Sequence, residues 1–233
     1  MILRLLPLIV GFLPIIGIHL SYIIAMNAGV VQECIPYIDG CVTISATGRY
    51  PPSTYMFKAV MLPQALLLGV YWLFAVAWFR AIGGVSGGPI RPVDRWIGGI
   101  GLGGAFFLVM YVTFLGAYDD FYTLMRRFGV YFYFLLTVVA QLIMTIQIMR
   151  HSNNPVLRRH GRVKLFLVIA PFILGIFNWT MKALIEDAGA IESRVEWTVS
   201  LMMQLWFVVS YYSWKVTGFS GRYAVENGDW YRA

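Results

Sequence analysis

The chain has 233 residues, of which 59% are hydrophobic and only 12% are charged. Soluble domains carry roughly 25% charged residues, so this composition excludes an ordinary soluble globular protein. The formal net charge is +7, which leaves two interpretations of the basic residues: a nucleic-acid surface or a membrane-topology signal.

Six apolar runs are each long enough for a helix that crosses a bilayer, which needs about 20 residues. Their hydrophobicity is continuous rather than alternating, which favours helices over a membrane barrel. The sequence therefore predicts an all-α integral membrane protein, with residues 1–233 forming a single domain of six transmembrane helices. The expected helices span about 5–26, 59–79, 96–117, 130–149, 165–184 and 199–216.

The first run could instead be a signal peptide, whose apolar core is about 7–15 residues long and ends at a small-residue cleavage site. This run is longer, contains Pro7 and Pro14, and lacks a clear A-x-A site in the following "MNAGVVQEC". We therefore interpret it as the first helix.

The distribution of Lys and Arg over alternate loops predicts the orientation. Most basic residues fall on the side that holds both termini, including the segment "RHSNNPVLRRHGRVK" (150–164) between two expected helices. We expect this side to be cytoplasmic, and we favour the topology signal over nucleic-acid binding. The opposite side then carries the longest loop, 27–58.

The two cysteines of the chain, Cys34 and Cys41, both fall in this first outer loop. A disulfide between them would stabilise the loop by roughly 2.5 kcal/mol in the chain-entropy description and requires an oxidising compartment. A metal-binding pair is the alternative, but no histidine lies nearby in the sequence, so we expect the disulfide and no metal.

The third apolar run begins with "GGIGLGGA" (98–105). Such small residues let helices approach closely, either within the chain or against a partner subunit. A phosphate-binding glycine loop would require a preceding strand, which the sequence does not offer.

Polar residues inside lipid are costly and suggest function. His19 could act as a general base if Asp119 or Asp120 orients it; the alternative is an interhelical hydrogen bond. Six further residues adjoin or lie within apolar segments and could form a polar pocket at the outer rim, or else a purely structural network. They are Lys58, Gln64, Asn178, Lys182, Glu196 and Gln204. Such a pocket would suit a lipid head group, with cations for phosphate and a carboxylate for an amine or hydroxyl.

The last apolar run is strongly aromatic. Trp and Tyr are enriched where a membrane meets water. We therefore expect Trp197, Tyr211, Tyr212 and Trp214 to lie in the two interfacial belts.

Two segments together resemble the Frag/DRAM/Sfk family. The first, "CIPYIDGCVTISATGRYPPSTYMFK", is similar to the first luminal loop of that family. The matching residues are Pro36, Ile44, Ser45, Gly48, Pro51 or Pro52, Tyr55 and Lys58. The second is "VEWTVSL", in which Glu196 and Trp197 resemble the Glu-Trp or Glu-Tyr that opens the family's last helix.

The resemblance covers nearly the whole chain and implies lipid handling at the non-cytoplasmic leaflet. Members that remodel GPI anchors resemble "HSAPR" early in their second helix, whereas this chain has "LPQA" (62–65). The absence of that His and Arg argues against an acyltransferase of the GPI-remodelling kind. Short tails indicate a bacterial member in the inner membrane, with its outer loops in the periplasm.

We therefore expect a protein that binds or remodels membrane lipids at the extracytoplasmic leaflet, with a polar site under the first outer loop. One alternative is a non-catalytic accessory subunit bound to other membrane-protein subunits. Another is a lipid acyltransferase or hydrolase that uses His19. No cofactor is signalled.

Overall fold

The computed structural model describes residues 2–84, 89–117, 119–185 and 189–219. Within these ranges the chain is helical and contains no strand. Six long helices dominate: α1 (Leu6–Asn27), α4 (Ser53–Ile82), α5 (Pro92–Thr113), α6 (Asp120–His151), α7 (Pro155–Leu184) and α8 (Gly189–Val216). A 3₁₀ turn, η1 (Ile2–Leu5), precedes α1, and two one-turn helices, α2 (Pro36–Asp39) and α3 (Ile44–Thr47), lie between α1 and α4.

Five of the long helices, α1 and α4 to α7, are long and apolar enough to cross a membrane. The all-helical membrane architecture is therefore confirmed. The sixth expected span corresponds to α8, which is less apolar because it carries Ser200, Gln204, Ser210 and Ser213. All four side chains are buried inside the protein. The sixth span and the cytoplasmic position of both termini stay predictions, and the C-terminal tail, 220–233, lies outside the described residues.

Four helices begin well before the apolar runs that predicted them. α4 begins at Ser53, α6 at Asp120, α7 at Pro155 and α8 at Gly189, whereas the runs begin near 59, 130, 165 and 199. Hydropathy marks only the lipid-compatible part of a helix, while capping decides where the helix starts. In α6, the Asp119 carboxylate accepts a hydrogen bond from the backbone N–H of Phe121 at 2.9 Å. Residues that were expected in loops therefore lie at fixed positions on these additional helical turns.

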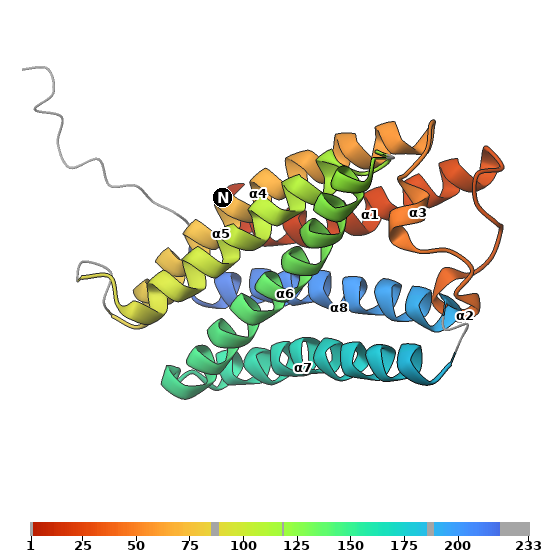
Figure 1. Ribbon diagram of the computed structural model, residues 1–233. Helices are drawn as coiled ribbons and strands as arrows, with labels where there is room; N and C mark the ends of the chain where they lie inside the picture. Colours follow the sequence, from red (N-terminus) through yellow and green to blue (C-terminus); the bar gives the residue numbers. More distant parts are fainter. Residues whose placement is uncertain (1, 85–88, 118, 186–188, 220–233) are drawn as a thin grey trace, which may run out of the picture.

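The six long helices form a closed ring of neighbours. In ring order they are α1, α4, α5, α6, α7 and α8, and α8 contacts α1 again (Figure 1). An aromatic core fills the ring, where Tyr71 stacks on Trp214 at 5.7 Å between ring centroids and donates a hydrogen bond to Ser210. Trp197 and Trp214 are 1% and 0% exposed. The expectation that these two residues lie in the interfacial belts is therefore wrong, because their rings fill the bundle interior.

The glycine run of α5 packs within this chain. Gly101 lies against the indole of Trp72 in α4, and Gly104 lies against Thr137 in α6, with no room for a side chain at either position. Gly129 of α6 approaches the backbone of Tyr111 in the same way. Small residues therefore let α6 cross α5 closely, as close helix packing predicts.

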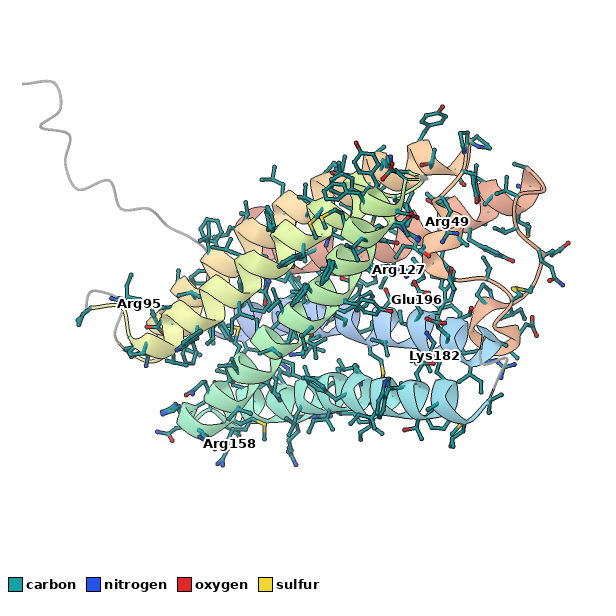
Figure 2. The ribbon with its side chains drawn as sticks, in the orientation of Figure 1. Arg49, Arg95, Arg127, Arg158, Lys182 and Glu196 are labelled. Carbon is teal, nitrogen blue, oxygen red and sulfur yellow. A yellow bond between two sulfur atoms is a disulfide. The ribbon has the colours of Figure 1, made fainter. Side chains whose placement is uncertain are left out.

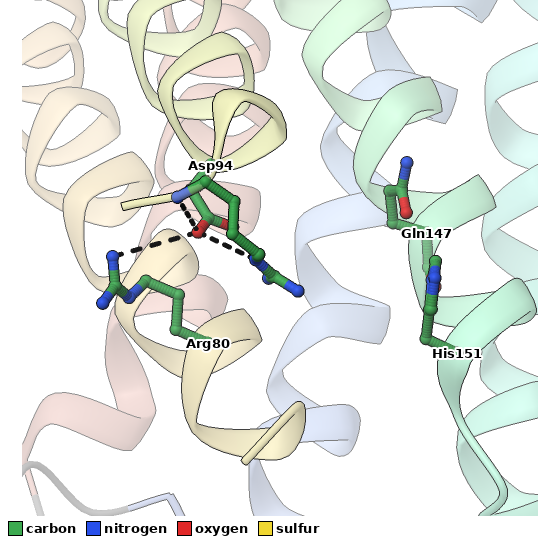
Figure 3. Close-up of polar contacts among 5 residues, drawn as sticks. Arg80, Asp94, Gln147 and His151 are labelled. Carbon is green, nitrogen blue, oxygen red and sulfur yellow. Dashed lines mark hydrogen bonds and ion pairs between the residues drawn. The ribbon is translucent and has the colours of Figure 1, made fainter. Parts of the chain in front are cut away.

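An ionic cluster ties α4 to α5 (Figure 3), where α4 ends and α5 begins, at the end of the bundle away from α2 and α3 (Figure 1). The buried carboxylate of Asp94 accepts hydrogen bonds from the Arg91 side chain at 2.8 and 3.1 Å and from its backbone N–H at 3.1 Å. Arg80 of α4 lies 3.9 Å from the same carboxylate. Because the charge is hydrogen-bonded on several sides, its burial is tolerated.

Candidate functional site

The segment between α1 and α4, residues 28–52, forms a lid over one end of the bundle. Its Cys34–Cys41 disulfide is confirmed, with 6.6 Å between the two Cα atoms. The Tyr22 hydroxyl of α1 donates to the Cys34 carbonyl at 2.8 Å and accepts from the Cys34 N–H at 2.9 Å. The disulfide loop is therefore fixed to α1 as well as closed on itself.

The lid also docks on α8. The indole N–H of Trp197 donates to the Val42 carbonyl at 2.9 Å, and Arg194 donates to the Asp39 carbonyl at 3.3 Å. Gly40 lies against the Ala190 backbone with a φ of +67°, so a side chain there would meet both a clash and backbone strain. These contacts hold the lid close to the first turns of α8.

His19 takes part in this docking. Its Nδ1 lies 2.7 Å from the Ile15 carbonyl, which can only accept, so Nδ1 carries the proton. Nε2 is then the acceptor for the Tyr37 hydroxyl at 3.2 Å. Burial raises the pKa of Tyr37, which keeps this phenol protonated as the donor. The imidazole also meets the edge of the Trp197 ring, with 5.3 Å between centroids.

The two aspartates expected to orient His19 are not among its hydrogen-bond partners in the described residues. Asp119 caps α6 through Phe121, and Asp120 is exposed in the first turn of the same helix. His19 does make a hydrogen bond between helices, the alternative weighed above, because its partner Tyr37 lies in the one-turn helix α2 of the lid. Catalytic roles for His19, Asp119 and Asp120 stay predictions.

A cavity of about 670 Å³ lies beside the lid, walled by α6, α7 and α8. Its position follows from the path of α6, which crosses the bundle obliquely from the lid end toward the start of α7 (Figure 1). Arg49, Arg127, Glu196 and Lys182 gather at this end, while Arg95 and Arg158 lie at the opposite end (Figure 2). The volume is within the range of about 300–1,000 Å³ that is usual for small-molecule sites.

One end of the cavity is rich in charge. Arg49 comes from the lid, just after α3, and Arg126 and Arg127 come from the second turn of α6. None of these arginines forms an ion pair with another described residue. Two glutamates of α8 share this end: Glu192 pairs with Lys182 at 2.6 Å, and Glu196 faces the backbone amides of Ile44 and Ser45.

The rest of the cavity is apolar. Its lining residues from α6, α7 and α8 include Val130, Phe134, Leu135, Val138, Pro171, Phe172 and Val199. At the outer edge, Tyr131 and Leu135 of α6 and Ile176 and Trp179 of α7 are 48–75% exposed. Large exposed apolar side chains on membrane helices are compatible with contact to lipid, so the cavity has an apolar opening between α6 and α7.

The structure brings together part of the predicted pocket. Asn178 and Glu196 line the cavity, and Lys182 reaches its edge through Glu192. Gln204 lines a small adjoining void of about 20 Å³ that Glu196 also lines. Gln64 donates instead to the Val10 carbonyl between α4 and α1, and Lys58 is not a lining residue. Their binding roles stay predictions.

Sequence reasoning missed the three arginines. Arg49 falls in the first outer loop, and Arg126 and Arg127 fall between the third and fourth expected helices, so none of the three was singled out. A signal was nevertheless present: the "DD" at 119–120 is a helix-capping pattern that extends α6 through "RR" (126–127).

Comparison with known families gives one match. The family model described as "Frag1/DRAM/Sfk1/Cwh43P N-terminal domain" matches residues 2–215, nearly the whole chain. No curated protein and no solved structure matches the chain.

Proposed function

The chain belongs to the Frag1/DRAM/Sfk1/Cwh43P family of membrane proteins, and on this premise we propose that it binds a membrane lipid in the cavity beside the lid. The head group lies among the arginines, and the acyl chains leave between α6 and α7 into the bilayer. The positive-inside rule and the disulfide both support a position in the extracytoplasmic leaflet.

The observation that carries this proposal is the division of one cavity into a cationic and an apolar end. No carboxylate among the described residues pairs with Arg49, Arg126 or Arg127. A bound anion would balance their charge and accept their hydrogen bonds. Guanidinium groups bind phosphate through paired, charge-assisted hydrogen bonds. The apolar walls suit acyl chains, so an amphiphile with a phosphate head fits both ends at once.

Binding is proposed in preference to catalysis because His19 is not among the described residues that line the cavity. Neither Asp119 nor Asp120 is among its hydrogen-bond partners in the described residues. The accessory-subunit alternative loses part of its basis as well, since Gly101 and Gly104 pack inside the chain rather than on its surface.

Native mass spectrometry of the full chain, extracted in mild detergent, tests the proposal. We expect the wild type to retain lipid and the double variant Arg126→Gln/Arg127→Gln to retain at least tenfold less. A charge-assisted hydrogen bond contributes about 1.5–3 kcal/mol, and 1.4 kcal/mol is tenfold in affinity.

The matched control is Arg95→Gln/Arg158→Gln, which removes the same charge at the opposite end of the bundle (Figure 2). This control should retain lipid like the wild type, and both double variants should keep the wild-type melting temperature. Equal lipid retention by the two double variants would show that the cavity is not the binding site and would refute the proposal.

A further inference from the structure

Three residues that line the cavity carry a polar atom without a hydrogen-bond partner in the described part of the chain. The Tyr111 hydroxyl can donate or accept and so sets no condition, whereas Arg49 Nε can only donate and Asn178 Oδ1 can only accept. Arg49 comes from the lid and Asn178 from α7, so the two atoms approach the cavity from different elements. Enclosed polar groups are normally paired, and an unpaired one costs free energy. A ligand that satisfies both atoms must offer an acceptor and a donor.

The charges around the cavity determine which sign of net charge the ligand should carry. Three guanidinium groups, those of Arg49, Arg126 and Arg127, line the cavity together with the carboxylate of Glu196. The other carboxylate, that of Glu192, is already paired with Lys182. The site therefore keeps an excess of positive charge, and a ligand with a net negative charge fits it better than a zwitterion.

These two conditions separate the common phospholipid head groups. Choline and ethanolamine heads make the lipid zwitterionic and bring a second cation toward the arginines. Phosphatidic acid lacks a polyol, and its doubly ionised phosphate has no O–H to donate to Asn178 or Glu196. A polyol attached to the phosphate is neutral, keeps the phosphodiester negative, and supplies several O–H donors.

Resting on the proposed lipid-binding function, we infer that the cavity selects an anionic phosphodiester lipid whose head group carries free hydroxyls. The phosphodiester oxygens accept from Arg49, Arg126 and Arg127. The head-group hydroxyls donate to Asn178 Oδ1 and to the Glu196 carboxylate. Asn178 is then the residue that distinguishes this head group from a bare phosphate.

A competition experiment tests the inference. The full chain, washed free of native lipid in detergent, receives an equimolar mixture of five lipids with identical acyl chains: phosphatidylglycerol, phosphatidylinositol, phosphatidic acid, phosphatidylethanolamine and phosphatidylcholine. Native mass spectrometry then measures the retained amounts. We expect the glycerol or inositol lipid to exceed both zwitterionic lipids at least tenfold and phosphatidic acid about fivefold.

Asn178→Leu keeps the side-chain size but removes the acceptor. We expect this variant to lose the preference over phosphatidic acid and to keep the preference over phosphatidylcholine. Asn153→Leu, an exposed position at the other end of the bundle, is the control and should keep both preferences. Because the readout is a ratio between lipids retained by the same sample, a general loss of folded protein does not change it.

The outcomes separate the inference from the proposal on which it rests. Preference for the glycerol or the inositol lipid supports the inference and identifies the source of the polyol. Equal retention of phosphatidic acid and both polyol lipids, still dependent on Arg126 and Arg127, overturns the inference and leaves lipid binding intact. Retention that ignores the arginines, or no retention at all, overturns both.

Discussion

Trp197 provides the sharpest test of how the lid is held, because its one polar bond can be removed with little change of shape. The substitution Trp197→Phe deletes the indole N–H that donates to the Val42 carbonyl at 2.9 Å. Val42 is 6% exposed, and its carbonyl has no other hydrogen bond among those seen in the described ranges. The variant thus leaves a buried acceptor unpaired.

The expected magnitude follows from that unpaired carbonyl. A buried acceptor that loses its partner costs about 1–3 kcal/mol, which corresponds to roughly a 5- to 150-fold increase in the equilibrium constant for lid opening. Val42 immediately precedes Thr43, which lines the cavity and caps α3 by accepting from the Ala46 N–H at 3.2 Å. Opening at Val42 should therefore loosen α3 as well.

Hydrogen exchange followed by mass spectrometry measures this opening directly. We expect lid peptides that cover α3 to exchange faster in Trp197→Phe by the factor above. The matched control is Trp206→Phe, since Trp206 is also a buried tryptophan of α8 and donates to Thr145 Oγ1 at 2.9 Å. That bond lies in the bundle core, so the control should leave lid exchange unchanged. Equal acceleration in both variants, or none in either, would refute this account of the lid.

Two further predictions concern the helix bundle. A Cβ on Gly129 would lie 2.6 Å from the Tyr111 backbone N, so Gly129→Ala should destabilise the protein by about 1–3 kcal/mol. The control is Gly99→Ala, whose Cβ meets nothing within 4 Å, and it should be neutral or slightly stabilising. If Gly129→Ala and Gly99→Ala had equal melting temperatures, close packing at Gly129 would be disproved. The buried ammonium of Lys164 has no hydrogen bond in the described chain and lies 4.3 Å from the centroid of an indole ring of Trp206. The ammonium also lies 5.7 Å from the centroid of a Trp78 ring. Each cation–π contact contributes about 2 kcal/mol when desolvated, and desolvation of an ammonium without a hydrogen bond or a carboxylate partner costs more, so Lys164→Met should raise the melting temperature. Lys215→Met, at an exposed site, is the control and should leave the melting temperature unchanged. A lower melting temperature for Lys164→Met would show that the contacts of the ammonium outweigh the cost of its desolvation.

The sequence by itself determined the features that depend on local composition. Long apolar runs identified the helices, because a bilayer-spanning segment must satisfy its own backbone hydrogen bonds and cover itself with apolar side chains. The pairing of Cys34 with Cys41 followed from their isolation in one loop, and the resemblance in the lid and at Glu196 led to the family that the family model shows.

The candidate site was only half predictable, since it depends on how helices cross. Asn178 and Glu196 were identified as polar residues at apolar segments, but nothing local showed that Arg126 would lie near them rather than near Lys58. The oblique path of α6, permitted by Gly104 and Gly129, decides that arrangement.

Burial inside the bundle was likewise a property of the tertiary structure. An aromatic residue near a helix end suits an interfacial belt and a protein core equally well by composition. Trp197 lies in the core because the lid folds back over α8 and accepts its indole N–H. Likewise, His19 bonds to Tyr37 because the disulfide loop brings α2 to that face of α1. Composition can thus tell which residues belong in lipid or in a loop, whereas only the packed chain decides which of them meet.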